Sequence, residues 1–315
     1  MITLEHIDKS YNKGSIQAVK DVSFKVAPGE MFGLIGPDGA GKTTLFRILT
    51  TLLLPDSGHA TVNGLDIIRD LDKIRSSVGY MPGRFSLYQD LTIEENLQFF
   101  ATVFGTTIKE NYNLIKDIYQ QIEPFKDRRA GKLSGGMKQK LALCCALIHK
   151  PTVLFLDEPT TGVDVVSRKE FWDMLGRLKK EGITILVSTP YMDEASRCDR
   201  VALIQKGSIL SIDEPAGIVR AFPLDLYAAT APNTHLLLRE IREYPGTDSC
   251  FAFGDALHVT FKGDRADGGA GVAAGGAAVA ADRLLPWLAE KGLPDARLKK
   301  ITPGIEDCFI HLLKS

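Results

Sequence analysis

The spacing of hydrophobic residues predicts a sheet of buried strands at the centre of this chain. Continuous apolar runs are found at Met31 to Ile35, at Ile183 to Ser188, and from Pro151 up to the adjacent carboxylates Asp157 and Glu158. Such runs are typical of parallel strands that are covered on both faces. Partial alternation and β-branched residues predict further strands at Ile2 to Ile7 and Ile16 to Val26.

Helical spacing of apolar residues alternates with these strands and predicts an α/β fold. The helical stretches are Leu45 to Leu53, Thr92 to Phe104, Ile108 to Phe125, Met137 to Ile148 and Ser167 to Lys180. The helices from Thr92 to Phe104 and from Ile108 to Phe125 carry no cluster of reactive side chains, so we interpret this part of the chain, about residues 84–148, as a helical lobe inserted into the core.

The pattern changes near Phe222. Short strand and helix patterns follow it, which predicts a core domain at 1–222 and a small α+β appendage at 223–315. Within the appendage, Gly268 to Ala281 is almost entirely glycine and alanine, a composition typical of a surface loop.

Charge, hydrophobic runs and cysteine content exclude some classes of function but do not identify one. The 315 residues have a formal net charge of −1, which argues against nucleic acid as the main ligand. No apolar run approaches the roughly 18 residues of a membrane span, and the first residues do not resemble a signal peptide, so we expect a cytoplasmic chain. The five cysteines form no C-x-x-C pair and are expected to be reduced.

A glycine-rich loop lies between the strand that ends at Ile35 and the helix that follows, and it fits the pattern G-x-x-x-x-G-K-[ST]. Its residues are Gly36, Pro37, Asp38, Gly39, Ala40, Gly41, Lys42, Thr43 and Thr44. Glycines let successive backbone N–H groups turn towards an anion, and the helix N-terminus adds further donors. We therefore predict a nucleotide-phosphate site, with Lys42 on the β- and γ-phosphates and the Thr43 hydroxyl on Mg²⁺.

Two other segments carry candidate chemistry. A second glycine turn at Ser134, Gly135 and Gly136 opens onto a predicted helix, whose N-terminus suits an anion. Asp157 and Glu158 end a buried strand, where ligands bind in open α/β sheets. They either cap the next helix or serve the phosphate loop, Asp157 as a Mg²⁺ ligand and Glu158 as the base that polarises water.

Together, the phosphate loop, the Leu133 to Gln139 turn, the Leu154 to Pro159 strand end and the Thr161 to Asp164 segment resemble the ATP-binding subunits of ABC transporters. The resemblance covers residues 1 to about 220 and implies a P-loop ATPase core. The tail from Ile301 to Ile310 is similar to that of ABC-2 type exporters, and two core motifs look most like the multidrug branch.

The resemblance also implies partners and roles. It implies ATP and Mg²⁺ as cofactors, a cytosolic subunit on the membrane, permease subunits, and a second ATPase subunit in a head-to-tail dimer. Tyr11 then stacks on adenine, the Ser134 to Gly136 turn binds the partner's γ-phosphate, and Asp164 lies at the dimer interface. An aromatic residue at a strand end also fits ordinary packing.

Two positions depart from the family pattern. Gly83 stands where the family usually has a Gln beside Mg²⁺ and the attacking water, and Pro190 stands where it has a His on the γ-phosphate. Neither residue supplies the missing side-chain polar atom. The alternatives are an asymmetric heteromer with slow own-site turnover, a dimerisation module, a non-transport ABC ATPase, or a homodimer in which Gln89 or Thr189 substitutes.

Overall fold

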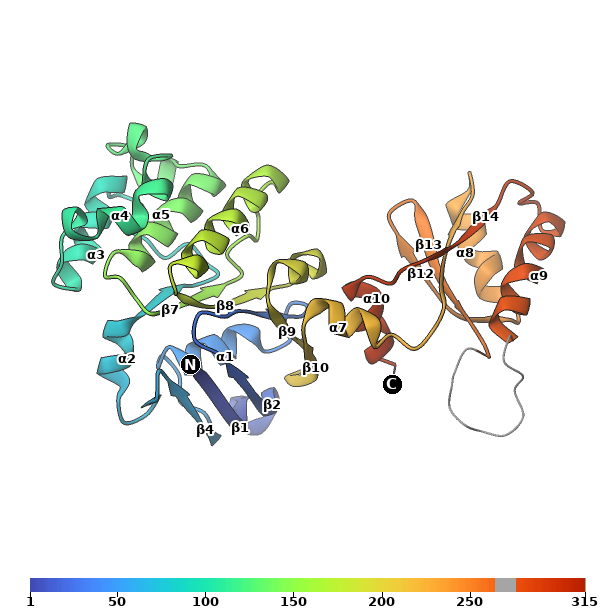
Figure 1. Ribbon diagram of the computed structural model, residues 1–315, viewed down its shortest axis with the longest axis horizontal. Helices are drawn as coiled ribbons and strands as arrows, with labels where there is room; N and C mark the ends of the chain where they lie inside the picture. Colours follow the sequence, from blue (N-terminus) through green and yellow to red (C-terminus); the bar gives the residue numbers. More distant parts are fainter. Residues whose placement is uncertain (264–275, 315) are drawn as a thin grey trace. The chain divides into compact units, whose positions relative to one another are not determined.

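The computed structural model describes residues 1–263 and 276–314, and it divides the chain into two compact units, Met1–Ala216 and Gly217–Ser315 (Figure 1). The division falls slightly before the boundary expected at 222, at the start of the helix α7, Pro215–Arg220.

The centre of the first unit is a six-stranded sheet in the order β10-β9-β3-β8-β7-β6. Its strands are β3 (Met31–Ile35), β6 (Val78–Met81), β7 (Val153–Asp157), β8 (Thr184–Thr189), β9 (Arg200–Gln205) and β10 (Ser208–Asp213). All neighbours are parallel except the β9-β10 hairpin. Ile35 pairs with Thr189, and Asp157 pairs with Ser188, so the carboxyl ends of β3, β7 and β8 meet at one edge.

A second, antiparallel sheet in the order β2-β1-β4-β5 completes this core. Its strands are β1 (Ile2–Tyr11), β2 (Ile16–Val26), β4 (Ser57–Val62) and β5 (Leu65–Asp66). Apolar side chains of α1, Lys42–Leu49, belong to the same buried cluster as residues of both sheets, including Leu4 and Phe155. The predicted extension of α1 to Leu53 is wrong, because the backbone turns left-handed at Thr51 (φ 61°).

The predicted helical lobe contains α3 (Ile93–Val103), α4 (Ile108–Tyr119) and α5 (Gly135–Leu147), which Figure 1 shows grouped together. Thr92 and Thr107 begin α3 and α4 with reciprocal capping bonds. The helix expected to reach Phe125 ends at Tyr119 instead, since Pro124 lacks the amide an α-helix interior requires; a 3₁₀ turn, Glu123–Phe125, follows. Helices α2 (Leu71–Ser77) and α6 (Val165–Lys180) complete the unit.

The second unit is a four-stranded antiparallel sheet in the order β12-β13-β11-β14 with helices α8 and α9 packed on one face. Its elements are β11 (Leu226–Thr230), α8 (Thr234–Glu243), β12 (Thr247–Phe253), β13 (Ala256–Phe261), α9 (Gly276–Glu290), β14 (Arg297–Ile301) and α10 (Ile305–Leu312). The β-α-β-β-α-β order is that of ferredoxin-like units.

The prediction of one continuous loop from Gly268 to Ala281 is wrong in its second half, because α9 begins at Gly276. Alanine is the strongest helix former, so this composition suits a helix once Leu284 and Leu288 anchor the next turns in the core. The part of the predicted loop at 268–275 lies outside the described residues.

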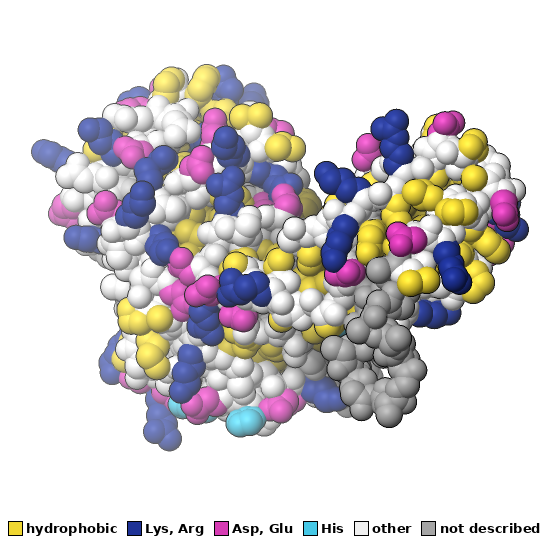
Figure 2. Space-filling model, turned by 45° about the vertical axis from the view of Figure 1, so that its right-hand side comes forward, with side chains coloured by type: hydrophobic (Ala, Val, Ile, Leu, Met, Phe, Trp, Pro, Cys, Tyr) yellow, Lys and Arg dark blue, Asp and Glu magenta, His cyan; other side chains and the backbone are white. Residues whose placement is uncertain are grey.

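Surface charge is mixed rather than gathered in one region. On the face shown in Figure 2, basic and acidic side chains alternate over the surface, in keeping with the formal net charge of −1. All five cysteines are buried, as expected for small apolar side chains. Among the described residues, no helix is both long and apolar enough to cross a membrane.

Candidate nucleotide-binding site

The phosphate loop connects β3 to α1, and two of its glycines are required by space. A Cβ at Gly36 would lie 2.2 Å from the Ile204 carbonyl oxygen, and one at Gly41 would lie 2.3 Å from the Ala18 carbonyl oxygen. Gly41 also has a φ of 105°, a conformation that side chains disfavour. The loop is therefore built to run between β2 and β9 with no side chain at these two points.

The loop ends in a set of backbone donors. The Leu45 amide donates to the Gly41 carbonyl at 3.2 Å, which leaves the amides of Lys42, Thr43 and Thr44 before it without an intrahelical acceptor. Asp38 and Gly39 form the exposed tip. A helix start of this kind suits a phosphate.

Lys42 is buried under the loop, with its side chain only 2% exposed. Its Nζ donates to the carbonyls of Gly36 at 2.7 Å and Pro37 at 3.0 Å, and it lies 3.0 Å from Oε1 of Glu158. The ammonium thus already faces the acid predicted to act as base, at the edge where β3 and β7 end.

Asp157 is 1% exposed at the end of β7. The Ser188 hydroxyl donates to its Oδ1 at 2.7 Å, and the Thr43 side chain also bonds it. Burial is the main reason that the pKa of Asp157 is raised, and the neighbouring charge of Glu158 adds to the rise.

A divalent cation fits beside these two residues. One hydroxyl and one buried carboxylate are hard oxygen donors, and Mg²⁺ is usually held by one or two carboxylates together with substrate phosphates. No group of three or more His, Cys, Asp or Glu suited to a metal is present in the described ranges.

Glu158 is held by its backbone. Its φ is 49°, and its amide donates to the Ser188 hydroxyl at 2.9 Å. Helix α6 begins later, at Val165, where the Asp164 side chain accepts from the Ser167 amide. The alternative that Asp157 and Glu158 cap the next helix is therefore wrong, and Asp164 is the cap.

Tyr11 and the second glycine turn lie in different surroundings. The Tyr11 hydroxyl is 3.3 Å from Oγ1 of Thr44, at the end of the phosphate loop. Ser134 caps α5 by accepting from the Met137 amide at 3.3 Å. The neighbouring glycines, Gly135 and Gly136, lie beside Gly162 and Ser167.

The two departures from the family pattern also lie at this edge. A Cβ at Gly83 would be 3.1 Å from the Asp157 carbonyl oxygen and 3.7 Å from its Oδ2. Pro190 directly follows the last residue of β8. Of the two side chains weighed as substitutes, the Thr189 hydroxyl donates to Glu194, and Gln89 is exposed beside Gly131.

Two features here escaped the sequence analysis. An apolar groove of about 210 Å³ runs between the core and the helical lobe, lined by Leu52, Tyr80, Met81, Leu87, Phe100, Phe104 and His149 among others. The segment beside it is held by Asn96, which is fully buried and bonds both the amide and the carbonyl of Tyr88 at 3.0 Å. A lone Asn in a helical pattern carried no signal for this role.

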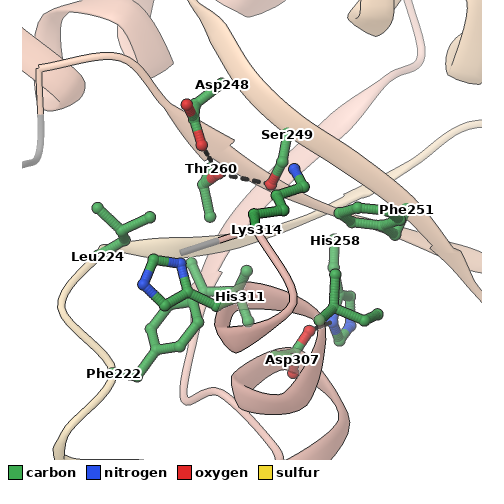
Figure 3. A pocket seen from close by; sticks show the side chains of 12 residues that line it. Phe222, Leu224, Asp248, Ser249, Phe251, His258, Thr260, Asp307, His311 and Lys314 are labelled. Atoms are coloured by element: carbon green, nitrogen blue, oxygen red, sulfur yellow. Dashed lines mark hydrogen bonds and ion pairs between the residues drawn. The ribbon is translucent and has the colours of Figure 1, made fainter. Parts of the chain in front are cut away.

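One small pocket of the second unit is shown in Figure 3. His258 and Asp307 pair across it at 2.7 Å, and Ser249 bonds Thr260. Its volume of about 20 Å³ leaves room for little more than a water.

A phosphate loop, a buried carboxylate with a second acid after it, and a separate Ser-Gly-Gly helix start on a parallel sheet define a P-loop ATPase of the ATP-binding cassette type. The family model for ABC transporters matches residues 19–161. NatA of Bacillus subtilis, an ABC transporter ATP-binding protein, is 37% identical over 67% of this chain and 88% of its own length. The chain belongs to this ABC transporter ATP-binding family.

Other relatives extend the comparison. A protein named "Probable multidrug ABC transporter ATP-binding protein YbhF" from Escherichia coli is 37% identical over 99% of this chain, which spans 52% of that relative's length. The doxorubicin resistance ATP-binding protein DrrA of Mycobacterium tuberculosis is 38% identical over 67% of this chain and 64% of its own. The cassette MJ0796, solved as a dimer with ADP and Pi, has a TM-score of 0.62 and 25% identity, covering 68% of this chain and 98% of that one.

Proposed function

We propose that this chain is the ATP-binding and ATP-hydrolysing subunit of an ABC-2 type exporter, peripheral on the cytoplasmic face of a membrane. The observation that carries the proposal is the meeting of the phosphate loop, Asp157, Glu158 and Pro190 at one sheet edge. The printed names of the multidrug and doxorubicin-resistance relatives support export as the task.

In this proposal, each side chain at the edge has one role. Lys42 gives up its contact with Glu158 and turns to the β- and γ-phosphates of ATP, which replace the carboxylate as its counter-charge. Thr43 and Asp157 would hold Mg²⁺, which would supply positive charge to neutralise the phosphates. Glu158, released from Lys42, accepts a proton from the attacking water.

A second ATPase subunit completes the site from outside. Ser134 and Gly135 are exposed, and Val165 and Val166 next to Asp164 are 78% and 69% exposed, an unusual position for paired apolar side chains. A head-to-tail partner would cover these residues and place its own counterpart of the Ser134 to Gly136 turn over the ATP bound at Gly36–Thr44. Tyr11, which lies beside Thr44, is then available to stack on the adenine ring of ATP.

The permease subunit would dock at the apolar groove beside Met81 and Leu87. Leu52 is 59% exposed in the groove, and Tyr88, the residue after Leu87, is 50% exposed, so a partner helix would bury apolar surface. The segment from Gly83 to Asp90 connects this groove to Asp157 and is the proposed route by which closure on ATP reaches the membrane partner.

The hydrolytic half of this chain's own site is depleted. Gly83 and Pro190 supply no polar side-chain atom, and the Thr189 hydroxyl is engaged with Glu194. The productive assembly is therefore a heteromer whose other cassette carries Gln and His at these positions. The second candidate, a dimerisation module that binds ATP with little turnover, is favoured by the same two residues.

Steady-state ATPase assays on the purified chain and its variants test the proposal. Pro190→His should raise kcat by about 10²-fold with little change in ATP affinity, because the added group acts mainly in the transition state. Gly83→Gln should raise kcat less, because a Cβ added at this position would lie only 3.1 Å from the Asp157 carbonyl oxygen.

The control is Pro232→His at an exposed position of the second unit, which should change nothing. Wild-type turnover by a verified homodimer on the order of 1 to 10³ per second, as in ordinary enzymes, would contradict the depleted-site model. Binding of ATP without turnover in every assembly would favour the dimerisation module.

A further inference from the structure

One buried carboxylate near the site has no part in the function proposed so far. Glu194 lies in the 3₁₀ segment Met192–Arg197 after β8 and is 3% exposed. Thr160 donates to both of its carboxylate oxygens, at 2.9 and 3.1 Å, and Arg168 Nε donates to Oε1 at 3.0 Å. The Thr189 hydroxyl donates to its other oxygen, Oε2.

The three donors come from three different parts of the site. Thr160 follows Glu158 by two residues and begins the segment that leads to Asp164. Thr189 ends β8 and precedes Pro190. Arg168 lies in the first turns of α6, the helix that Asp164 caps. The Glu194 carboxylate contacts all three.

The backbone around Pro190 is held from the same point. The Thr189 hydroxyl, besides donating to Glu194, accepts from the Tyr191 amide at 3.1 Å. The Arg168 guanidinium lies 4.1 Å from the centre of the Tyr191 ring. Residues on both sides of Pro190 are thus tied to the Glu194 carboxylate, directly or through one partner.

We propose that Glu194 is a positioning residue that makes the Thr189–Tyr191 loop and the Thr160–Asp164 segment move as one body. A carboxylate this deeply buried is strongly unfavourable without its donors, so neither segment shifts alone. A displacement of the Thr189–Tyr191 loop on nucleotide binding is therefore passed to Asp164 and the subunit interface. The inference rests on the proposed function in taking Pro190 as the γ-phosphate side of the site.

Hydrogen–deuterium exchange with and without Mg-ATP tests the coupling in the full chain. In the wild type, Mg-ATP should slow exchange about tenfold in peptides covering 36–44, 158–164 and 188–192. Glu194→Gln should keep the protection at 36–44 and lose it at 158–164. Thr160→Val removes one donor and keeps the Arg168 contact, so it should lose part of the protection from exchange at 158–164. This variant tests the proposal if Glu194→Gln does not fold.

The matched control is Asp193→Asn. Asp193 also pairs with Arg168, at 3.2 Å, but its side chain is 76% exposed and it does not join the contacts of Thr160 and Thr189. The control should keep the wild-type pattern. Equal protection of 158–164 in wild type, Glu194→Gln and Thr160→Val would overturn the proposal, as would a wild type in which this segment does not respond to Mg-ATP.

A kinetic readout separates this inference from the proposed function. The rise in kcat from Pro190→His should disappear in Pro190→His/Glu194→Gln, while ATP affinity stays within about twofold. If Pro190→His alone does not raise turnover, the depleted-site proposal fails, and the exchange result still decides the role of Glu194.

Discussion

Lys42 should stabilise the chain even before nucleotide binds. In Lys42→Met the stem is kept, but the carbonyls of Gly36 and Pro37 lose a charged donor and Glu158 loses its counter-charge. Each hydrogen bond to a charged group contributes about 1.5–3 kcal/mol, and breaking a buried ion pair costs about 3–5 kcal/mol.

Two conditions reduce that sum for Lys42→Met. The Glu158 side chain is 20% exposed and can turn to water, and the variant no longer buries an ammonium. We therefore expect a loss of about 2–3 kcal/mol, which lowers the melting temperature of a unit of this size by about 5–10 °C.

Thermal unfolding without nucleotide measures this directly. Glu158→Gln should lower the free energy of unfolding less in the Lys42→Met background than in the wild type, which gives a coupling energy of about 1–2 kcal/mol between the two positions. Lys73→Met, at a pair whose lysine is 70% exposed, is the control and should be almost neutral. Mg-ATP should stabilise the wild type and not Lys42→Met. This account would be refuted if Lys42→Met had the melting temperature of the wild type, or if calorimetry showed that it binds ATP with unchanged affinity.

Two further predictions follow from the same structure. The pKa of Asp157 is raised in the folded chain, so the free energy of unfolding falls as pH rises from the unfolded pKa of this carboxyl to its folded pKa. Asp157→Asn should remove that pH-dependent loss in unfolding experiments and should abolish Mg²⁺-dependent ATP binding. A variant less stable than the wild type at pH 7 would contradict this prediction. A chain ending near Phe222 should fold and bind ATP, since the strands and helices of the first unit precede Gly217; a monodisperse truncation that does not bind nucleotide would show otherwise.

Much of the site could be read from the sequence because its geometry is set by local patterns. Apolar runs located β3, β7 and β8, and parallel pairing brings their carboxyl ends together. The phosphate loop and the Asp157-Glu158 pair therefore had defined places before any coordinates. The sequence left open whether Asp157 and Glu158 cap the next helix, because two acidic segments precede α6 and spacing does not say which of them the amides meet.

Long-range side-chain contacts could not be read in this way. Glu194 is 34 residues from Thr160 and 26 from Arg168, and an acidic residue in a short polar segment is usually exposed. The extent of α9 depended on packing rather than on composition, since a Gly/Ala stretch suits a loop unless neighbouring apolar residues anchor it.

The site separates binding from hydrolysis, and this explains how both departures are tolerated. The binding half consists of backbone amides, glycines wedged against Ile204 and Ala18, and a buried lysine, so it is part of the core packing. The hydrolytic half would consist of side chains at 83 and 190, which follow strands and fill no core position. Gly83 lies against Asp157 without displacing it, and the hydrogen bonds around Pro190 come from Thr189 and Tyr191. The fold and the phosphate loop therefore do not depend on polar side chains at these two positions, and the proposed slow turnover rests on these two substitutions alone.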